Sequence, residues 1–404
     1  MELVTLDAIR DARERLQGIT MTTPVERSRA VGELVGGEVW LKCENLQRTG
    51  SFKLRGAYNR IARLSEAERA NGVVCASAGN HAQGVALAAA LQGVRATVVM
   101  PREAPLPKVD ATQAYGAEVR LEGDTFDEAL QTALEYARSS GQVFVHPFDH
   151  PDIIAGQGTI GLEILDQVPD TGTVLVCLGG GGLLSGIAVA LRALRPGVRI
   201  VGVQATGSAS FPPSLEAGEP VSAPTCDTIA DGIAVKRPGE LTLAHVRELV
   251  DEVVTVDDEE IARAVVLLLE RAKLVVEPAG AAAVAALLAG RIEVSGDHAT
   301  VATLSGGNID PLMLQHLVTG GLTTEGRYVT LRTQVPDTPG QLSRLLRLVG
   351  DERANVVGVS HHRLENRLRL GQVEVVLELE TRGHDHVARL LAALEEGGYP
   401  LHRP

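Results

Sequence analysis

The sequence contains few lysines, which limits the residues that could serve as a catalytic amine. Arginines supply most of the positive charge, and the lysines among the 404 residues are Lys42, Lys53, Lys108, Lys236 and Lys273. The formal net charge is −13 and no basic run is present. A negative chain without a basic patch argues against nucleic acid or an anionic membrane surface as a partner, so we expect neither.

Cysteines and long apolar runs are also scarce. The four cysteines, Cys43, Cys75, Cys177 and Cys226, show no C-x-x-C spacing, and Cys75 and Cys177 lie in apolar runs typical of buried strands. Reduced core thiols fit a cytosolic protein. The apolar runs stop short of the ~20 residues that span a bilayer, and the N-terminus has the pattern of an amphipathic helix rather than a signal peptide. We therefore expect a soluble, cytoplasmic protein.

Aromatic residues make up only 3% of the chain, whereas glycine is plentiful (43) and hydrophobic residues reach 45%. Over the first three quarters of the chain, short apolar runs alternate with helical patterns. For example, "GTVLVCL" precedes "LLSGIAVALRAL", and "GVVCASAGN" precedes "HAQGVALAAALQG". Strands with continuous apolar faces, separated by helices, predict an α/β fold with a mostly parallel sheet covered on both sides.

The pattern changes near residue 320. The stretch "TGGLTTEGR" is rich in Gly and Thr and predicts a linker over residues 320–327. Beyond it, "YVTLRTQV" and "VEVVLELE" alternate in hydrophobicity, "PGQLSRLLRLVG" and "HVARLLAALEEGG" carry helical stripes, and "NVVGVSHHR" is a strand candidate. The order β-α-β-β-α, with a further strand candidate at "YPLHR", predicts a separate α+β domain over residues 328–404.

Four consecutive glycines stand between a predicted strand and a predicted helix: Gly179, Gly180, Gly181 and Gly182. Glycines let backbone N–H groups turn toward an anion, and the helix dipole favours one there. The dinucleotide pattern G-x-G-x-x-G fails, because its third glycine would fall on Leu184 or Ser185, and Gln204 stands where an acidic residue is expected. A single phosphate therefore fits better than a pyrophosphate. The alternative is that the glycines serve only tight packing.

The stretch "GSFKLRGA" sets Lys53 between Phe52 and Leu54. An apolar setting lowers the pKa of a lysine and makes its neutral, nucleophilic form available. Together with a single-phosphate loop in an α/β protein, this lysine suggests pyridoxal phosphate, whose aldehyde forms a Schiff base with the amine. The alternative is a surface lysine whose stem covers apolar atoms.

Five motifs, in this order, resemble the threonine dehydratase group of the tryptophan-synthase-β-like pyridoxal-phosphate enzymes. They are "NLQRTGSFKLRGA" (45–57), "SAGNHAQG" (77–84), "GGGGL" (179–183), "EPAG" (277–280) and "SGGN" (305–308). The resemblance implies fold type II: two twisted, mostly parallel sheets in a catalytic region over 1–319, with a smaller subdomain of about 50–150 inserted in the larger one. The tail, with "PDTPGQL", resembles an ACT regulatory domain, which implies a βαββαβ order and a site for an amino-acid effector.

The resemblance also implies roles for single residues. Lys53 would form the Schiff base and remove the substrate α-proton, and Phe52 would pack against the cofactor ring. Asn80 would hydrogen-bond the ring's 3′ oxygen, and Ser305 would face the pyridine nitrogen. Taken alone, Asn80 could instead be a helix cap and Ser305 a turn residue. The phosphate would be cradled by Gly179, Gly180, Gly181, Gly182 and Leu183, and the substrate carboxylate would be held by backbone N–H groups of Ser77, Ala78, Gly79, Asn80 and His81.

Some relatives, the eukaryotic-type serine racemases, hold a divalent cation with carboxylates after the strand that follows the glycine loop. This chain has Gln204, Ser208 and Ser210 there and no carboxylate. A hard cation prefers anionic oxygen ligands, so we expect no such metal site. The resemblance also places Asp231 near the pocket and leaves the role of Glu277 open.

The implied reaction is β-elimination of water from L-threonine, and also L-serine, giving 2-oxobutanoate or pyruvate and ammonia. A serine hydroxyl opposite the pyridine nitrogen makes the ring a moderate electron sink, which suits elimination over transamination. Two alternatives stay open: a serine or hydroxyaspartate racemase-dehydratase or β-replacement synthase of the same fold, and a non-catalytic amino-acid sensor. The resemblance further implies a homodimer or homotetramer. It does not decide the effector, or whether the enzyme makes isoleucine precursors or degrades amino acids.

Overall fold

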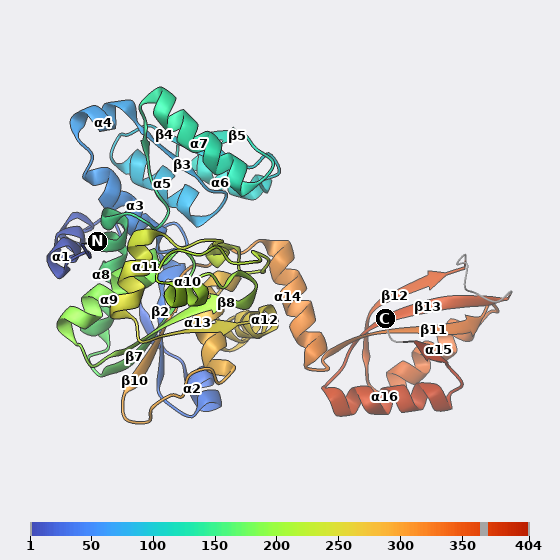
Figure 1. The fold of residues 1–404 in the computed structure, drawn as a ribbon. Helices are drawn as coiled ribbons and strands as arrows, with labels where there is room; N and C mark the ends of the chain where they lie inside the picture. The colour runs from blue at the N-terminus through green and yellow to red at the C-terminus, as the bar shows by residue number, and fades with distance from the viewer. Residues whose placement is uncertain (1, 364–370, 403–404) are drawn as a thin grey trace. The chain divides into compact units, whose positions relative to one another are not determined.

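The computed structural model describes residues 2–363 and 371–402. It divides into two compact units, Met1–Ile309 and Asp310–Pro404 (Figure 1). Among the described residues, no helix is long and apolar enough to cross a membrane.

The first unit contains a six-stranded sheet in the order β1-β2-β10-β7-β8-β9. All neighbouring strands are parallel except β1 and β2. The bounds are Val25–Arg27 (β1), Val39–Cys43 (β2), Thr171–Cys177 (β7), Arg199–Ala205 (β8), Glu252–Val256 (β9) and Ala299–Leu304 (β10). The central strands β7 and β10 are almost entirely buried, which accounts for the absence of charged residues from their sequences, TGTVLVC and ATVATL.

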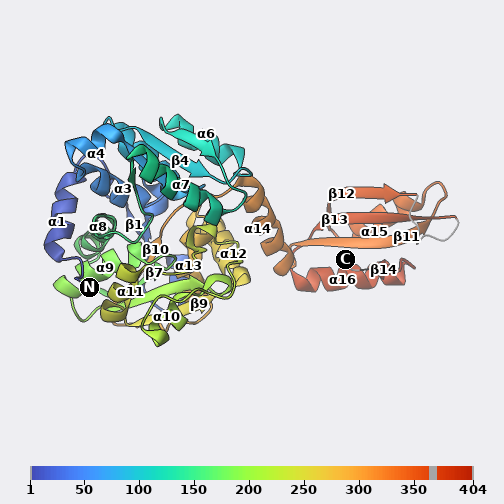
Figure 2. The same cartoon turned by 45° about the horizontal axis from the view of Figure 1, so that its top comes forward.

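A smaller sheet lies between β2 and β7 in the chain. Its order is β5-β4-β3-β6, and all its pairs are parallel. Figure 2 shows β4 of this sheet with the helix over Phe126–Ser140 (α7), which packs on it. Its strands are Val73–Ala76 (β3), Ala96–Met100 (β4), Glu118–Leu121 (β5) and Val143–Phe144 (β6). The helices that accompany the two sheets and position the site are Lys53–Ala62 (α3), Asn80–Leu91 (α5), Leu106–Ala114 (α6), Pro151–Gln167 (α8), Gly182–Leu194 (α9) and Pro278–Leu288 (α13).

The small residues of α5 allow a close approach to α3. A Cβ at Gly84 would lie 3.1 Å from both the backbone carbon and the Cβ of Lys53. The sequence "HAQGVALAAALQG" therefore does more than favour a helix. It lets the start of α3, which carries Lys53, lie directly against α5.

The second unit is built on a four-stranded antiparallel sheet in the order β12-β13-β11-β14. Its elements are Tyr328–Pro336 (β11), Gln341–Asp351 (α15), Asn355–His362 (β12), Gln372–Glu380 (β13), His384–Glu396 (α16) and Leu401–His402 (β14). Leu345 and Val349 from α15 and Leu390 and Leu394 from α16 are fully buried in its core. The predicted β-α-β-β-α order with a final strand is confirmed.

The linker predicted over residues 320–327 is mostly helical. Helix α14 spans Pro311–Thr324 and includes both glycines of "TGGL". The Asp310 side chain accepts from the backbone N–H groups of Leu312 and Met313 and so caps the helix start. Two interior glycines cost about 1 kcal/mol each relative to alanine, which does not end a helix that is already capped. Gly326, at φ 66°, follows its end.

Candidate active site

A cavity of about 780 Å³ lies in the first unit at the carboxyl ends of strands from both sheets. Ser77 directly follows β3, the glycine loop follows β7, and Ser305 follows β10. Ligands of open α/β sheets bind at such strand ends. The cavity brings together all the residues singled out in the sequence: Phe52, Lys53, Ser77, Ala78, Gly79, Asn80, His81, Gly179, Gly180, Gly181, Gly182, Leu183 and Ser305.

Lys53 is the first residue of α3 and reaches into this cavity. Its Nζ donates to the carbonyl of Pro147 at 3.1 Å and lies 5.2 Å from the centre of the Phe52 ring. Burial lowers the pKa of Lys53 to about 8, against the opposing attraction of Glu277. An amine with this pKa is partly neutral near neutral pH, as a nucleophile must be.

The glycine loop connects β7 to α9 in a space where side chains do not fit. A Cβ at Gly180 would lie 2.2 Å from the Phe148 ring, and one at Gly179 would lie 2.9 Å from the Cα of Ile233. Gly181 has φ 94°, which favours glycine. The first amides of a helix have no partner inside it, so the loop and the start of α9 present backbone N–H groups suited to an anion.

Asn80 is held at the cavity wall by two side chains from distant parts of the chain. Its Nδ2 donates to Glu277 Oε1 at 2.7 Å, and its Oδ1 accepts from Asn308 Nδ2 at 2.8 Å. Asn308 also donates to the carbonyl of Thr49 at 2.7 Å. These contacts fix which side of the Asn80 amide is the donor. Gly79 is the N-cap residue of α5 and no side chain caps that helix, so the cap alternative for Asn80 is wrong.

Glu277, whose role the sequence left open, is a buried carboxyl beside Asn80. Its pKa is raised to about 7. Burial is the largest cause, the nearby Asp231 adds to the rise, and the Asn80 hydrogen bond opposes both. Asp231 forms an ion pair with Lys108 at 2.8 Å, and both residues line the cavity.

Not every amide between Ser77 and His81 is directed at the cavity. The Ser77 N–H donates to the Val99 carbonyl at 3.1 Å, as a continuation of the sheet ladder. The Gly79 N–H donates to Ser77 Oγ at 3.1 Å. Both amides therefore already have partners within the protein, which corrects the expectation that they hold a ligand. His81 is buried with Nε2 2.9 Å from the Val145 carbonyl, and burial lowers its pKa to about 3, so its ring is neutral.

Residues 17–306 match the model of the family described as pyridoxal-phosphate dependent enzymes, and residues 329–396 match that of the ACT domain. The chain belongs to the pyridoxal-phosphate dependent enzymes. The cofactor of this enzyme is therefore pyridoxal phosphate, and the predicted α/β fold with a C-terminal ACT domain is confirmed.

The relatives of this pyridoxal-phosphate enzyme agree in fold. It is 49% identical over 399 residues to the L-threonine ammonia-lyase of Thermotoga maritima, with 99% of both chains covered. Among solved structures, threonine deaminase isoform 2 from Solanum lycopersicum matches with a TM-score of 0.73 and 37% identity, covering 78% of this chain and 89% of that one. Maize serine racemase matches with a TM-score of 0.75 and 36% identity, covering 80% of this chain and 100% of that one.

The cavity fits this cofactor by the chemistry of the residues that line it. A volume of about 780 Å³ is within the usual range for a small-molecule site, ~300–1,000 Å³. The glycine loop offers an anion cradle that a side chain would fill, and Lys53 offers an amine with a pKa of about 8. Among the described residues, no group of three or more His, Cys, Asp or Glu side chains is placed to hold a metal ion.

The sequence assigned no site role to several residues that line the cavity: Cys177, Asn308 at the end of the "SGGN" motif, and the segment His146, Pro147 and Phe148. The last three follow β6, and the rule that strand ends carry ligands could have found them. The His146 Nδ1 accepts from the backbone N–H of Asp149 at 2.8 Å, and burial lowers its pKa to about 4. The ring is thus a neutral acceptor that holds this loop in place.

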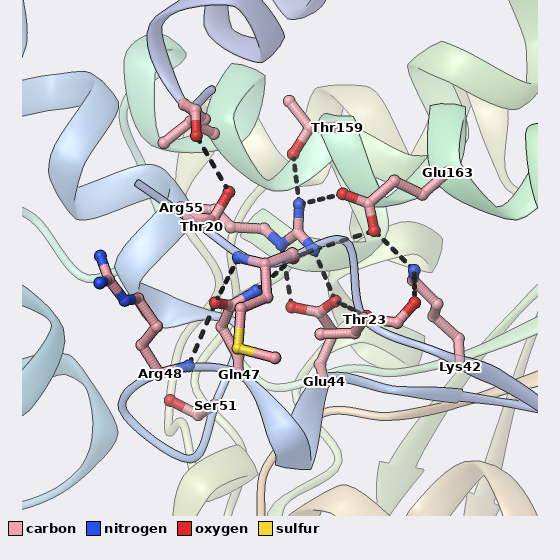
Figure 3. A network of polar contacts seen from close by, with 12 residues as sticks. Thr20, Thr23, Lys42, Glu44, Gln47, Arg48, Ser51, Arg55, Thr159 and Glu163 are labelled. Carbon is pink, nitrogen blue, oxygen red and sulfur yellow. Dashed lines mark hydrogen bonds and ion pairs between the residues drawn. The ribbon is translucent and has the colours of Figure 1, made fainter. Parts of the chain in front are cut away.

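A buried ionic network anchors α3, the helix that begins at Lys53 (Figure 3). Arg55, two residues after Lys53, contacts Glu44 at 2.8 Å and Glu163 at 2.6 Å. Glu163 also accepts from Lys42 Nζ at 2.5 Å. The two cations, Lys42 and Arg55, balance the charge of the two carboxylates. Their contacts connect α3 to β2, to the turn after β2 and to α8. The first turn of α3 is therefore tied to the larger sheet at several points.

Proposed function

We propose that this enzyme dehydrates and deaminates L-threonine, and also L-serine, to 2-oxobutanoate or pyruvate and ammonia. The observation that carries the proposal is the Lys53 amine, held at a pKa of about 8 in one cavity with the glycine loop. It is supported by the 49% identity, over nearly the full length, to an L-threonine ammonia-lyase.

The residues of the cavity divide the work by position. Pyridoxal phosphate, when bound, supplies the electron sink that makes the substrate α-proton acidic. Lys53 Nζ would accept that proton, and Phe52 would pack on the cofactor ring. The N–H groups of Gly179 to Leu183 would hold the phosphate. Asn80 would direct the side-chain N–H that Glu277 does not use toward the 3′ oxygen, and Ser305 would direct its hydroxyl toward the pyridine nitrogen.

The substrate carboxylate binds at the first turn of α5. Asn80 and His81 are the first two residues of this helix, and their N–H groups have no partner inside it. We assign the carboxylate to these amides, with the Ala78 amide and the Ser77 hydroxyl. The neutral His81 ring adds no charge, so the helix dipole and hydrogen bonds provide the recognition. Departure of the β-hydroxyl as water, followed by hydrolytic release of ammonia, gives the 2-oxo acid.

We also assign regulation to the ACT domain and catalysis to the region before it. The predicted catalytic region, 1–319, contains the family match over 17–306, and the predicted regulatory domain, 328–404, is supported by the ACT match over 329–396. The compact units divide somewhat earlier, after Ile309. An amino acid is the effector that this domain type suggests. We further propose a homodimer or homotetramer, no divalent cation after β8, and a cytoplasmic location, the last supported by four free cysteines.

A product assay tests the proposed activity. The purified, cofactor-loaded enzyme is incubated with L-threonine and, separately, with L-serine, and the 2-oxo acid, ammonia and D-amino acid are measured. The proposal predicts equimolar 2-oxobutanoate and ammonia from L-threonine. D-Serine exceeding pyruvate would favour the racemase alternative instead, and the absence of any product would favour the sensor.

A further inference from the structure

Asn308, at the end of the "SGGN" motif, lines the active-site cavity and bridges two parts of the chain that are far from it in sequence. Its Nδ2 donates to the Thr49 carbonyl at 2.7 Å and to Asn80 Oδ1 at 2.8 Å. Thr49 belongs to the loop that leads to Lys53, and Asn80 is the first residue of α5. One amide group therefore connects the loop before the lysine to the start of that helix.

The backbone around this contact is fixed by hydrogen bonds between the SGGN segment and the loop before α3. The Phe52 N–H donates to the Ser305 carbonyl at 3.1 Å, and the Gly307 N–H donates to the Gly50 carbonyl at 2.8 Å. Gly50 has φ 70°, and a Cβ there would overlap with Asn308 Oδ1, so only glycine lets the loop come this close. The Asn308 side chain is thus held in place from both sides.

These contacts determine the direction of a chain of hydrogen bonds. A backbone carbonyl can only accept, so Asn308 must turn its Nδ2 toward Thr49. The same Nδ2 faces Asn80 Oδ1, so Asn80 turns its own Nδ2 the other way and donates one N–H to Glu277 Oε1 at 2.7 Å. Among the described residues, no acceptor is placed for the second N–H of Asn80. Because the direction is set at the Thr49 end, it does not depend on whether Glu277 is ionised.

We infer that Asn308 is a positioning residue, which directs the second side-chain N–H of Asn80 into the cavity and so toward the 3′ oxygen of the cofactor. The inference rests on the proposed function, in which Asn80 contacts that oxygen. Without the Asn308 donor, the Asn80 amide can turn over and present its carbonyl oxygen instead. Two acceptors then face each other and the hydrogen bond to the cofactor is lost.

The binding of the cofactor to variants of the full-length apoenzyme tests the inference. Asn308→Ala removes the donor, and Asn308→Asp removes it while keeping the shape of the side chain. The matched control, Asn45→Ala, removes an amide that donates to the Val275 carbonyl at 3.1 Å and lies beside the same segment, but is not among the residues that line the cavity. Absorbance titrations give the dissociation constant of pyridoxal phosphate. They are repeated in an Asn80→Ala background and with 3-deoxypyridoxal phosphate, which lacks the ring oxygen.

The inference predicts a dissociation constant about 2- to 10-fold above wild type in both Asn308 variants, the range for one neutral hydrogen bond. In the Asn80→Ala background, and with the analogue, the same substitutions should change it by less than about 2-fold, because one partner of that hydrogen bond is missing. Asn45→Ala should bind pyridoxal phosphate within about 2-fold of wild type. If Asn308→Ala does not fold, Asn308→Asp decides, since an effect of its added charge would persist with the analogue.

Wild-type affinity in the Asn308 variants would overturn the inference. So would an equal loss of affinity in the Asn80→Ala background or with the analogue, since Asn308 would then act on the loop rather than through Asn80. These readouts do not depend on turnover. If the wild type forms the 2-oxo acid while the variants bind as it does, only the inference fails. If the wild type forms no 2-oxo acid while the variants bind as predicted, only the proposed function fails.

Discussion

At the scale of single residues, Glu277 shows that the active site keeps a carboxyl group buried at a cost in folding free energy. The carboxyl is buried, and it fixes the Asn80 amide through a 2.7 Å hydrogen bond. Its pKa is raised to about 7 from an ordinary value of 4.5, mainly by burial. The ionised form is therefore disfavoured in the folded protein compared with the unfolded chain.

Replacing Glu277 by glutamine should change how stability depends on pH. Between about pH 4.5 and 7 the folded wild type holds a proton that the unfolded chain has lost, so its free energy of unfolding falls as the pH rises. The glutamine side chain of the variant does not titrate. Glu277→Gln should thus gain stability relative to wild type across this window, by an amount of the order of 3 kcal/mol. Thermal unfolding midpoints of both proteins from pH 4.5 to 8 test this, and parallel curves would refute it.

Site residues can be predicted best from the sequence where the chemistry requires one residue type within a short motif. Lys53, the glycine loop and Ser305 all stand in short motifs, and the structure brings them to one cavity. Asn308 and the role of Glu277 depend on partners far away in the chain; Asn80 and Asn308, for example, are 228 positions apart. No local pattern encodes such a contact.

At the scale of secondary structure elements, the site depends on the placement of α3. Its first residue is Lys53, and Arg55 ties the same turn to Glu44 and Glu163. Apolar periodicity predicted the strands and most helices well, since burial and pattern agree there. The prediction from composition differed from the structure at α14. The Gly- and Thr-rich composition favoured a linker, but the Asp310 N-cap and an apolar run maintain a helix through Thr324.

Replacing Arg55 by Leu should destabilise the first unit by about 3–5 kcal/mol, because the buried Glu44 would lose its ion-pair partner and Glu163 would keep only Lys42. Arg55 is 1% exposed. The control is Arg63→Leu, which breaks a 2.8 Å pair with Asp152 at a residue that is 46% exposed and should cost at most about 1 kcal/mol. Unfolding followed by the absorbance of the bound cofactor reports on this unit. Equal effects of the two substitutions would contradict an anchoring role for the network.

At the scale of the whole molecule, the chain joins a catalytic unit to a domain with its own core. The clusters around Leu54 and around Leu345 belong to different units. The composition change near residue 320 predicted a boundary there, whereas the chain divides after Ile309. Because α14 spans Pro311–Thr324, a truncation that leaves this helix whole falls after it.

A chain ending at Gly326 should keep the turnover of L-threonine and lose its response to amino-acid effectors. The ACT domain contains no residue of the proposed active site, so its removal leaves the chemistry in place. In the full-length enzyme, isoleucine or valine should change substrate affinity by about 5- to 150-fold, the usual range for coupled sites. Saturation curves with and without each amino acid measure this. An equal response from the truncated, cofactor-loaded enzyme would place the effector site elsewhere.

The central claim, that Lys53 carries the cofactor of a threonine-deaminating enzyme, is tested most directly by locating the cofactor on the chain. Borohydride treatment of the loaded enzyme fixes the cofactor to its lysine, and peptide mass mapping identifies which of the five lysines is modified. We expect the cofactor to be fixed to Lys53. In Lys53→Ala we expect no modified lysine and a loss of about 10³-fold or more in 2-oxobutanoate formation. Modification of Lys42, Lys108, Lys236 or Lys273 instead, or full activity in Lys53→Ala, would contradict it.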